Sequence, residues 1–307
     1  MICEGEGMME NLIVNPISER WYADPEARFY EGEYWIYVTN SIAFHDQKNI
    51  DVLHSKDLIH WESCRDIIDM SGYLGYRFAV WAPTVVEKNG KYYLIFACND
   101  IRNDEELGGL EIAVADHPAG PFKAYTDTLI GKFINGAQPI DAHLFKDDDG
   151  TIYLLYGGWR HCNIGIMNET MDGFVPLEDG TYFREITPED YVEAPCIMKK
   201  DDQYYFMWSS GDWMKGDYNV RYAVSENLFS GYSESKRILE SDPEVATGPG
   251  HNGYLYIPEK DMYLMIYHRH KLEEPDNGNA RYLCIDRMEV ADGEIKPVKM
   301  THSWVME

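Results

Sequence analysis

The chain has 307 residues, and its 53 aspartates and glutamates outnumber its 27 lysines and arginines, which gives a formal net charge of −26. A protein that binds nucleic acid or an anionic membrane surface needs a basic face, so this balance argues against both partners. Hydrophobic residues make up 45% and charged residues 26% of the chain, as in ordinary soluble globular proteins.

Aromatic residues form 14% of the chain, with 23 tyrosines, 11 phenylalanines and 8 tryptophans. Tyrosine and tryptophan favour strands, and core packing in strands accounts for most of them. Their rings also pack well against the C–H face of a sugar, so the acidic, aromatic composition points weakly towards carbohydrate.

Residues 1–10 carry no basic and apolar signal sequence, and no run of 18 apolar residues occurs. We therefore expect a cytoplasmic protein without a membrane span, or a secreted one if a leader has been removed. The cysteines form no C-x-x-C pair and are expected to be reduced, buried thiols. They are Cys3, Cys64, Cys98, Cys162, Cys196 and Cys284.

In chain order, five segments repeat one pattern, in which an alternating apolar run leads through a tight turn to an aromatic strand. This pattern is typical of a β-hairpin. The five segments are residues 27–41, 83–100, 142–159, 195–213 and 253–271. Their turns hold Gly32, Gly90 or Gly150, or the acidic pair Asp201-Asp202. Aligning the aromatic strands superposes Trp35, Tyr93, Tyr153, Tyr205 and Tyr263, in steps of 58, 60, 52 and 58 residues.

A further alternating segment follows each hairpin, at residues 49–62, 110–123, 162–175, 218–233 and 280–295. Four short strands in each of five repeats predict an all-β fold, a five-bladed β-propeller. Long helical periodicity is absent, which excludes a TIM barrel with its eight helices. We predict that residues 1–307 form a single catalytic propeller domain.

The innermost strand of each blade lines the central channel of a propeller. Counting back eleven or twelve residues from the aligned aromatics identifies one position in each blade. These positions hold Asp24, Trp81, Asp141, Glu193 and His251. The repeat therefore predicts three carboxyl groups, one tryptophan and one histidine around a single mouth.

Carboxyl groups crowded at one mouth cannot all ionise freely, so their proton affinities are pushed apart. One can remain a base while another holds a proton at neutral pH, which is the division of labour that glycosidic-bond hydrolysis requires. Metal-assisted hydrolysis is less well supported, because the chain has no H-E-x-x-H or comparable paired-histidine spacing.

From Tyr22 to about Thr301, the chain resembles glycoside hydrolase family 43, a group of inverting glycosidases built on five-bladed propellers. The matching stretches are residues 23–25, 54–62, 81–96, 139–157, 192–211 and 248–255. The resemblance implies that Asp24 is the general base and Glu193 the general acid. It implies that Asp141 adjusts the pKa of the acid and orients it. Ala142 and Ala194 stand where relatives often carry proline or glycine.

The resemblance also implies binding roles for three residues around the mouth. His251 would contact the sugar or help to hold a central cation, often calcium bound through waters; the alternative is a structural histidine. Arg281 resembles the fifth-blade arginine that reaches the acid, unless it is an ordinary charge at a strand edge. Trp81 is expected to stack on the sugar. The chemistry itself is expected to need no cofactor, and the resemblance allows a Ca²⁺ ion in the central channel.

The resemblance implies a substrate of oligosaccharides that contain α-L-arabinofuranosides or β-D-xylosides. The repeat is interrupted at residues 44–49, 99–109 and 268–279, and these segments are expected to form the rim with residues 159–161 and 211–213. Two alternatives remain, a retaining propeller glycosidase of the invertase or sialidase type and a sugar-binding propeller without catalysis. Around Asp24, the chain lacks the N-D-P-N-G pattern of invertases. The oligomeric state is not predicted.

Overall fold

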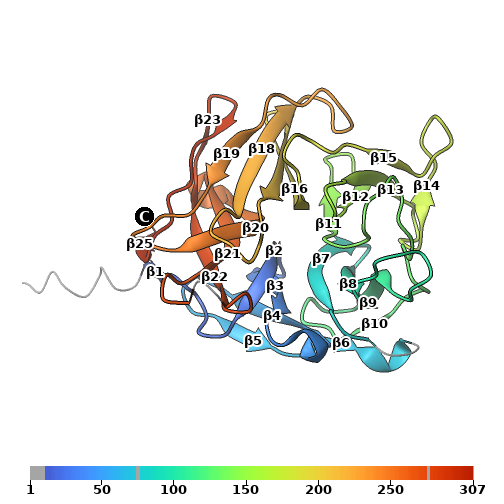
Figure 1. The fold of residues 1–307 in the computed structure, drawn as a ribbon, viewed down its shortest axis with the longest axis horizontal. Helices are drawn as coiled ribbons and strands as arrows, with labels where there is room; N and C mark the ends of the chain where they lie inside the picture. The colour runs from blue at the N-terminus through green and yellow to red at the C-terminus, as the bar shows by residue number, and fades with distance from the viewer. Residues whose placement is uncertain (1–10, 74–76, 275–276, 307) are drawn as a thin grey trace, which may run out of the picture.

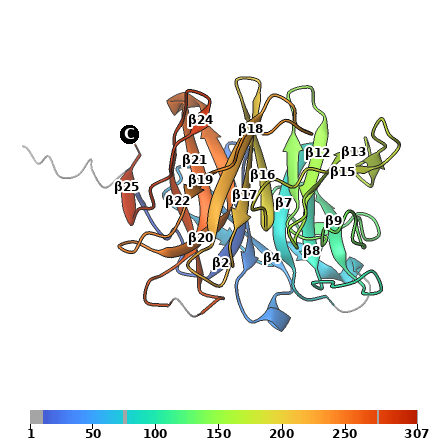
Figure 2. The ribbon, with the colours of Figure 1, turned by 45° about the horizontal axis from the view of Figure 1, so that its top comes forward.

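The computed structural model describes residues 11–73, 77–274 and 277–306. Five sheets stand in a ring about a central axis, as the blades of a propeller (Figure 1), and the tilted view shows them side by side (Figure 2). The predicted all-β, five-bladed fold is confirmed. Within the described residues, the helical segments are three 3₁₀ turns, η1 (Phe44–Asp46), η2 (Met70–Gly72) and η3 (Pro258–Lys260).

Each blade begins with the strand nearest the axis and continues outward as an antiparallel meander. Blade 1 contains β2 (Tyr22–Tyr30), β3 (Glu33–Asn40), β4 (Ile50–Ser55) and β5 (Glu62–Cys64). Blade 2 contains β7 (Trp81–Lys88), β8 (Lys91–Cys98), β9 (Gly109–Ala115) and β10 (Phe122–Ala124), with β6 (Ile68–Asp69) parallel to β10. Blade 3 contains β11 (His143–Lys146), β12 (Ile152–Tyr156) and β13 (Asn163–Met167), and β13 pairs with both β14 (Phe174–Val175) and β15 (Phe183–Glu185).

Blade 4 contains β16 (Glu193–Lys200), β17 (Gln203–Ser210), β18 (Asn219–Ser225) and β19 (Lys236–Leu239). Blade 5 contains β20 (Thr247–Ile257), β21 (Met262–His270) and β22 (Arg281–Met288). Outside the blades, β1 (Leu12–Val14) pairs with β25 (Ser303–Val305), and β23 (Val290–Ala291) pairs with β24 (Glu294–Ile295).

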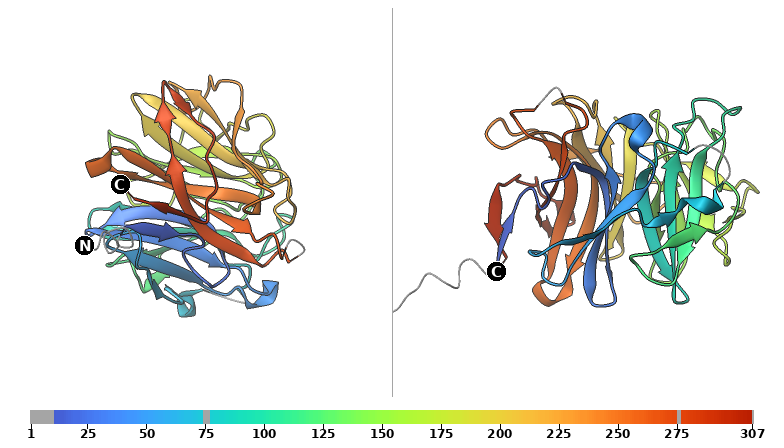
Figure 3. Two further views of the ribbon diagram at one scale, coloured as in Figure 1. Left: turned by 90° about the vertical axis from the view of Figure 1, so that its left-hand side faces the viewer. Right: turned by 90° about the horizontal axis from the view of Figure 1, so that it is seen from below.

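Blade 5 departs from the four-strand expectation, because its described sheet has three strands. The segment after β1 occupies the outer edge instead. The Asn15 side chain bonds both backbone groups of Ile285, and the Ile17 N–H donates to the Leu283 carbonyl. β1 and β25 lie beside this blade at the rim of the ring (Figure 3). The start and end of the described chain thus close the outermost edge of the last blade.

The predicted hairpin turns are confirmed, and they follow from backbone conformation. Both central residues have positive φ in Glu31-Gly32, Asn89-Gly90 and Asp201-Asp202. Two positive φ angles in a two-residue loop define the type I′ turn, whose twist matches that of the flanking strands. Glycine, asparagine and aspartate tolerate this conformation best.

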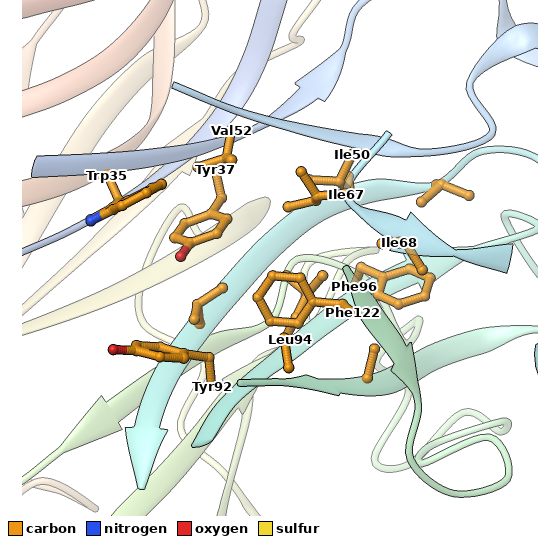
Figure 4. Close-up of a cluster of buried hydrophobic side chains, with 14 of the residues drawn as sticks. Trp35, Tyr37, Ile50, Val52, Ile67, Ile68, Tyr92, Leu94, Phe96 and Phe122 are labelled. Atoms are coloured by element: carbon orange, nitrogen blue, oxygen red, sulfur yellow. The ribbon is translucent and has the colours of Figure 1, made fainter. Parts of the chain in front are cut away.

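The blades pack against one another through buried apolar side chains. Figure 4 shows the layer between blades 1 and 2, where Tyr37 and Val52 face Leu94, Phe96 and Phe122. The aligned aromatic residues contribute unequally to these layers. Trp35 and Tyr205 are buried, whereas their counterparts are only partly buried and pack at the edges of the clusters. Those counterparts are Tyr93, Tyr153 and Tyr263.

All five described cysteines are free thiols, four of them buried and Cys64 partly exposed, while Cys3 lies outside the described residues. Burial raises the pKa of the Cys196 thiol well above its usual range. Of the helical segments that the structure describes, none is long and apolar enough to cross a membrane.

Candidate active site

In four of the five blades, a β-bulge near the start of the innermost strand directs side chains into the mouth of the channel. The pairing of β2 with β3 shifts by one residue between Ala23 and Glu26, and the shift recurs in β7, β16 and β20. A bulge turns successive side chains towards the same region, because the extra residue breaks the strict alternation of the strand. Asp24 lies within the first bulge with a φ of 53°.

The bulges correct the predicted equivalence of the five mouth residues. Asp24, Asp141 and His251 have positive φ and occupy one position. In blades 2 and 4, the residues with positive φ are instead the alanines that follow Trp81 and Glu193. In blades 3 and 5, one more residue separates the residue with positive φ from the aligned aromatic residue. Counting back along the sequence therefore reached different structural positions in different blades. The residues around the mouth therefore come from two adjacent positions. Asp24 is the residue with positive φ in its blade, whereas Glu193 directly precedes that residue in its own.

Asp24 is held as a carboxylate. Arg281 Nη1 donates to its Oδ1 over 3.0 Å, and His251 Nδ1 lies 3.3 Å from the same oxygen. Burial raises the pKa of Asp24, but the Arg281 and His251 charges and the hydrogen bonds of Thr39 and Arg281 outweigh it, so the pKa lies below its usual range. Arg281, at the start of β22, also donates from Nε to Ser41 Oγ across the joint between blades 5 and 1. It thus hydrogen-bonds to the expected base rather than to the expected acid.

Asp141 and Glu193 show the opposite behaviour. Burial, followed by the charges of Glu193 and Asp24, raises the pKa of Asp141 well above its usual range. Burial also raises the pKa of Glu193 to about 6, although a hydrogen bond from Tyr218 partly offsets it. The Ala194 N–H donates to Asp141 Oδ2 over 3.1 Å, and Tyr218 Oη donates to Glu193 Oε1 over 2.8 Å. Asp141 is therefore hydrogen-bonded to the backbone of the residue that directly follows Glu193.

All six predicted site residues line one cavity of about 430 Å³. They are Asp24, Trp81, Asp141, Glu193, His251 and Arg281. The rim combines aromatic with polar and charged side chains, and each expected rim segment contributes to the lining. The lining residues from these segments are Phe44, Gln47, Asp100, Arg102, Trp159, Trp213 and Asn279. In the right-hand view of Figure 3, η1 and the segment after β21 rise from the same face of the ring.

Contacts among the rim residues fix the aromatic walls. Trp81 Nε1 donates to Gln47 Oε1, and the Trp81 ring meets Phe44 edge-to-face at 5.6 Å. The Arg281 guanidinium lies 4.9 Å from the Trp213 ring. Half of the surface of Trp159 is exposed. The cavity thus combines a charged floor with apolar walls, as sugar-binding clefts do.

The residues around the mouth do not form a direct metal site. Among the described residues, no group of three or more His, Cys, Asp or Glu side chains is arranged to hold a metal ion. His251 directs Nδ1 towards Asp24 and Asp141, which lie 3.3 and 3.7 Å away. A calcium ion held by His251 through waters stays a prediction.

The sequence model of "Glycosyl hydrolases family 43" matches residues 13–295, which is most of the chain. The chain belongs to glycoside hydrolase family 43. It is therefore a glycosidase, as the carboxyl groups of the mouth predicted, and its substrate is a carbohydrate. The match starts within β1, so it includes the segment that closes the ring.

Relatives agree with this assignment over nearly the whole chain. A β-D-galactofuranosidase from Aspergillus niger is 35% identical over 304 residues, covering 94% of this chain and 85% of that protein. A β-xylosidase from Xylanibacter ruminicola is 28% identical, covering 91% and 97%. Among solved structures, an α-L-arabinofuranosidase from Clostridium thermocellum superposes with a TM-score of 0.73 at 27% identity, covering 93% of this chain and 96% of that one.

Sequence reasoning did not identify two buried residues behind the family 43 carboxyl groups, Tyr218 and His268, and it wrongly assigned His268 to a rim segment. Tyr218 precedes β18 in the segment that follows the fourth hairpin, and His268 lies within β21. Neither belongs to an innermost strand, so counting along the repeat could not identify them. The link between Gly250 and Tyr218 emerges only in the structure, where a Cβ at Gly250 would lie 2.1 Å from Tyr218 Cε1.

Proposed function

We propose that this family 43 enzyme hydrolyses glycosidic bonds with inversion, with Asp24 as general base, Glu193 as general acid and Asp141 as the group that adjusts the acid. The supporting observation is the opposite direction of two pKa shifts in one cavity. Against the effect of burial, the pKa of Asp24 is lowered, first by the charge of Arg281, while burial raises the pKa of Glu193 to about 6. A base must be ionised and an acid protonated at the working pH.

The proposed reaction is a single displacement. Glu193 gives its proton to the leaving glycosidic oxygen as the bond to the anomeric carbon breaks. Asp24 takes a proton from a water molecule, whose oxygen attacks that carbon from the opposite face. Such a mechanism requires the two carboxyl groups to stand about 6.5–9.5 Å apart, leaving room for the water. Arg281 keeps Asp24 ionised between turnovers, and no cofactor takes part in these steps.

For the substrate, we propose the non-reducing end of an oligosaccharide that carries α-L-arabinofuranosyl or β-D-galactofuranosyl groups, with β-D-xylosides as the second choice. The relatives above are named for these three specificities. The two furanosides share the configuration of every ring carbon and differ only in the length of the group on C4. A furanose site can therefore accept both if the wall beside that group leaves room.

The cavity supports action on a chain end. Its volume of about 430 Å³ and its lining from all five blades suit one or two sugar units better than a long chain. Trp81 begins β7 in blade 2, Trp213 lies in the loop between β17 and β18 of blade 4, and both line the cavity. The Trp81 ring, and the face of Trp213 that Arg281 does not cover, offer the apolar surface that the C–H face of a sugar needs.

A panel of p-nitrophenyl glycosides tests this proposal, with the α-L-arabinofuranoside, β-D-galactofuranoside and β-D-xyloside given to wild type, Asp24→Asn and Glu193→Gln. We expect wild type to hydrolyse a furanoside fastest. Asp24→Asn should lower kcat about 10²–10⁴-fold for the aryl glycosides, and Glu193→Gln should do so for an oligosaccharide, whose leaving oxygen needs a proton far more than p-nitrophenolate does. Asp116→Asn and Glu62→Gln are matched controls, because both side chains are mostly exposed. Activity near wild type in Asp24→Asn on the aryl glycosides, or in Glu193→Gln on the oligosaccharide, would remove that residue from its role, and no hydrolysis by wild type would favour a binding propeller.

A further inference from the structure

We propose that Tyr218 and His268, stacked behind the site, are positioning residues, one for each of the two catalytic carboxyl groups. The proposal rests on the roles given above to Glu193 and Asp24. Neither ring lines the cavity that holds those carboxyl groups. Both are almost fully buried, with 1% of Tyr218 and 0% of His268 exposed.

Tyr218 determines which oxygen of Glu193 can carry the proton. Its phenol donates to Oε1 over 2.8 Å. Burial, followed by the charge of Glu193, raises the pKa of Tyr218 well above its usual range, so the phenol stays protonated and remains a donor. With Oε1 occupied as an acceptor, the catalytic proton is left to Oε2.

The space for the Tyr218 ring exists because residue 250 lacks a side chain. A Cβ at Gly250 would lie 2.1 Å from Cε1 and 2.3 Å from Cδ1 of the ring. No such contact occurs between real atoms, so the ring and a larger residue exclude each other. Gly250 immediately precedes the bulge residue of blade 5, the position that holds Glu193 in blade 4.

His268 supports Asp24 through the backbone. The Asp24 N–H donates to His268 Nδ1 over 3.2 Å. Equivalent bonds support two other bulges, where the Ala82 N–H donates to Thr39 Oγ1 and the His251 N–H donates to Ser209 Oγ, each over 2.8 Å. The acceptors occupy one position in the second strand of their blades, opposite the residue before the bulge. Blade 5 thus uses an imidazole where blades 1 and 4 use a hydroxyl.

An imidazole can accept this hydrogen bond only while Nδ1 carries no proton. The hydrogen then lies on Nε2, which is buried without a partner. The groups that face the ring are Arg281, His251, His270 and the Asp24 carboxylate, whose Oδ1 lies 3.6 Å from Nδ1. Burial, followed by the first three groups, lowers the pKa of His268 well below its usual range. The ring is therefore a permanent acceptor for the backbone of the base.

Tyr218 and His268 also contact each other. The rings of Tyr218 and His268 are stacked, with centroids 5.9 Å apart and planes inclined by 13°. One ring bonds the side chain of the acid, and the other bonds the backbone of the base. Their contact therefore sets the separation of the two carboxyl groups from behind, without either ring touching substrate.

The first test compares His268→Asn with His268→Leu. These side chains have similar shapes, but the Asn Oδ1 can accept the Asp24 N–H and the leucine cannot. We expect His268→Leu to lower kcat about 10- to 100-fold, as befits a buried donor left unpaired. KM should change less than about threefold, and His268→Asn should recover most of the kcat. Equal kcat values for the two variants, or wild-type activity in His268→Leu, would overturn the proposal. If His268→Leu does not fold, His268→Gln replaces it, because its amide cannot reach the Nδ1 position.

The second test is the pH profile of Tyr218→Phe. The lost hydrogen bond stabilised the ionised form of Glu193, so the pKa of the acid rises and the basic limb of kcat/KM moves to higher pH. Tyr222→Phe is the matched control, because that phenol is buried and bonded to the Ile295 N–H away from the site. An unmoved limb in Tyr218→Phe would contradict its role. Full activity of Glu193→Gln on an oligosaccharide would instead refute the proposed function, so the two failures are distinguishable.

Discussion

Replacing Arg281 with methionine would remove the main cation that keeps Asp24 ionised. The guanidinium lies 3.0 Å from Asp24 Oδ1, and only 8% of Arg281 and 7% of Asp24 are exposed. Removing one partner of a buried ion pair typically costs about 3–5 kcal/mol, because the remaining charge is left without compensation. We expect a loss of this order in the free energy of unfolding at neutral pH, with methionine keeping the contact with the Trp213 ring.

The loss should depend on pH in a direction that the structure determines. In wild type, the lowered pKa of Asp24 contributes stability that is present above its unfolded-state value and is lost as the pH falls. Without Arg281, burial dominates and raises the pKa of Asp24, so keeping the group ionised in the folded state costs free energy as the pH rises. The difference in unfolding free energy between wild type and Arg281→Met should therefore be larger at pH 7.5 than at pH 5.

Urea denaturation at the two pH values measures this difference, and the acid limb of kcat/KM should move to higher pH in the same variant. Arg281→Lys is the control, because it keeps the positive charge but loses the Nε bond to Ser41. It should shift the limb less than methionine does. An equal loss of stability at pH 5 and 7.5, together with an unmoved acid limb, would refute the assignment of Arg281 as the group that keeps Asp24 ionised.

Three further outcomes are expected. The wild-type kcat/KM should fall above about pH 6, because Glu193 loses the proton it donates; a rate that stays flat to pH 8 would contradict this, provided circular dichroism shows a constant fold. Trp81→Ala should raise KM for a furanoside about tenfold and change kcat less, since it removes a stacking wall; an unchanged KM would exclude Trp81 from the sugar site. Gly157→Ala places a Cβ 2.0 Å from the His161 carbonyl oxygen at a φ of 145°. It should lower the free energy of unfolding, measured by urea denaturation, by about 1–3 kcal/mol. Wild-type stability would show that the backbone shifts to accommodate the added Cβ.

The repeat was sufficient to predict the fold because each blade is a local structure. Turns such as Asn89-Gly90 and the alternating strands around them are determined by neighbours in sequence. The closure of blade 5 was not predictable in this way. It depends on Asn15 meeting Ile285, which lies 270 residues further along the chain.

The predicted site residues line one cavity, but the contacts between them were not predicted. Asp24, Asp141 and Glu193 could be found because they recur near the starts of innermost strands. The one-residue bulges were not predicted, because each disturbs the alternation of its strand at a single position near the strand start. Tyr218 and His268 were missed for a different reason. Tyr218 lies in a loop and His268 in a second strand, and only the assembled ring brings them to the carboxyl groups.

The stereochemistry of the first product tests the central claim most directly. Wild-type enzyme would be mixed with p-nitrophenyl α-L-arabinofuranoside or β-D-galactofuranoside, whichever reacts faster, and the anomeric proton followed by ¹H NMR before the product mutarotates. The roles of Asp24 as base and Glu193 as acid predict that the inverted anomer appears first. First appearance of the retained anomer would contradict the single displacement and would require one of the carboxyl groups to act as a nucleophile.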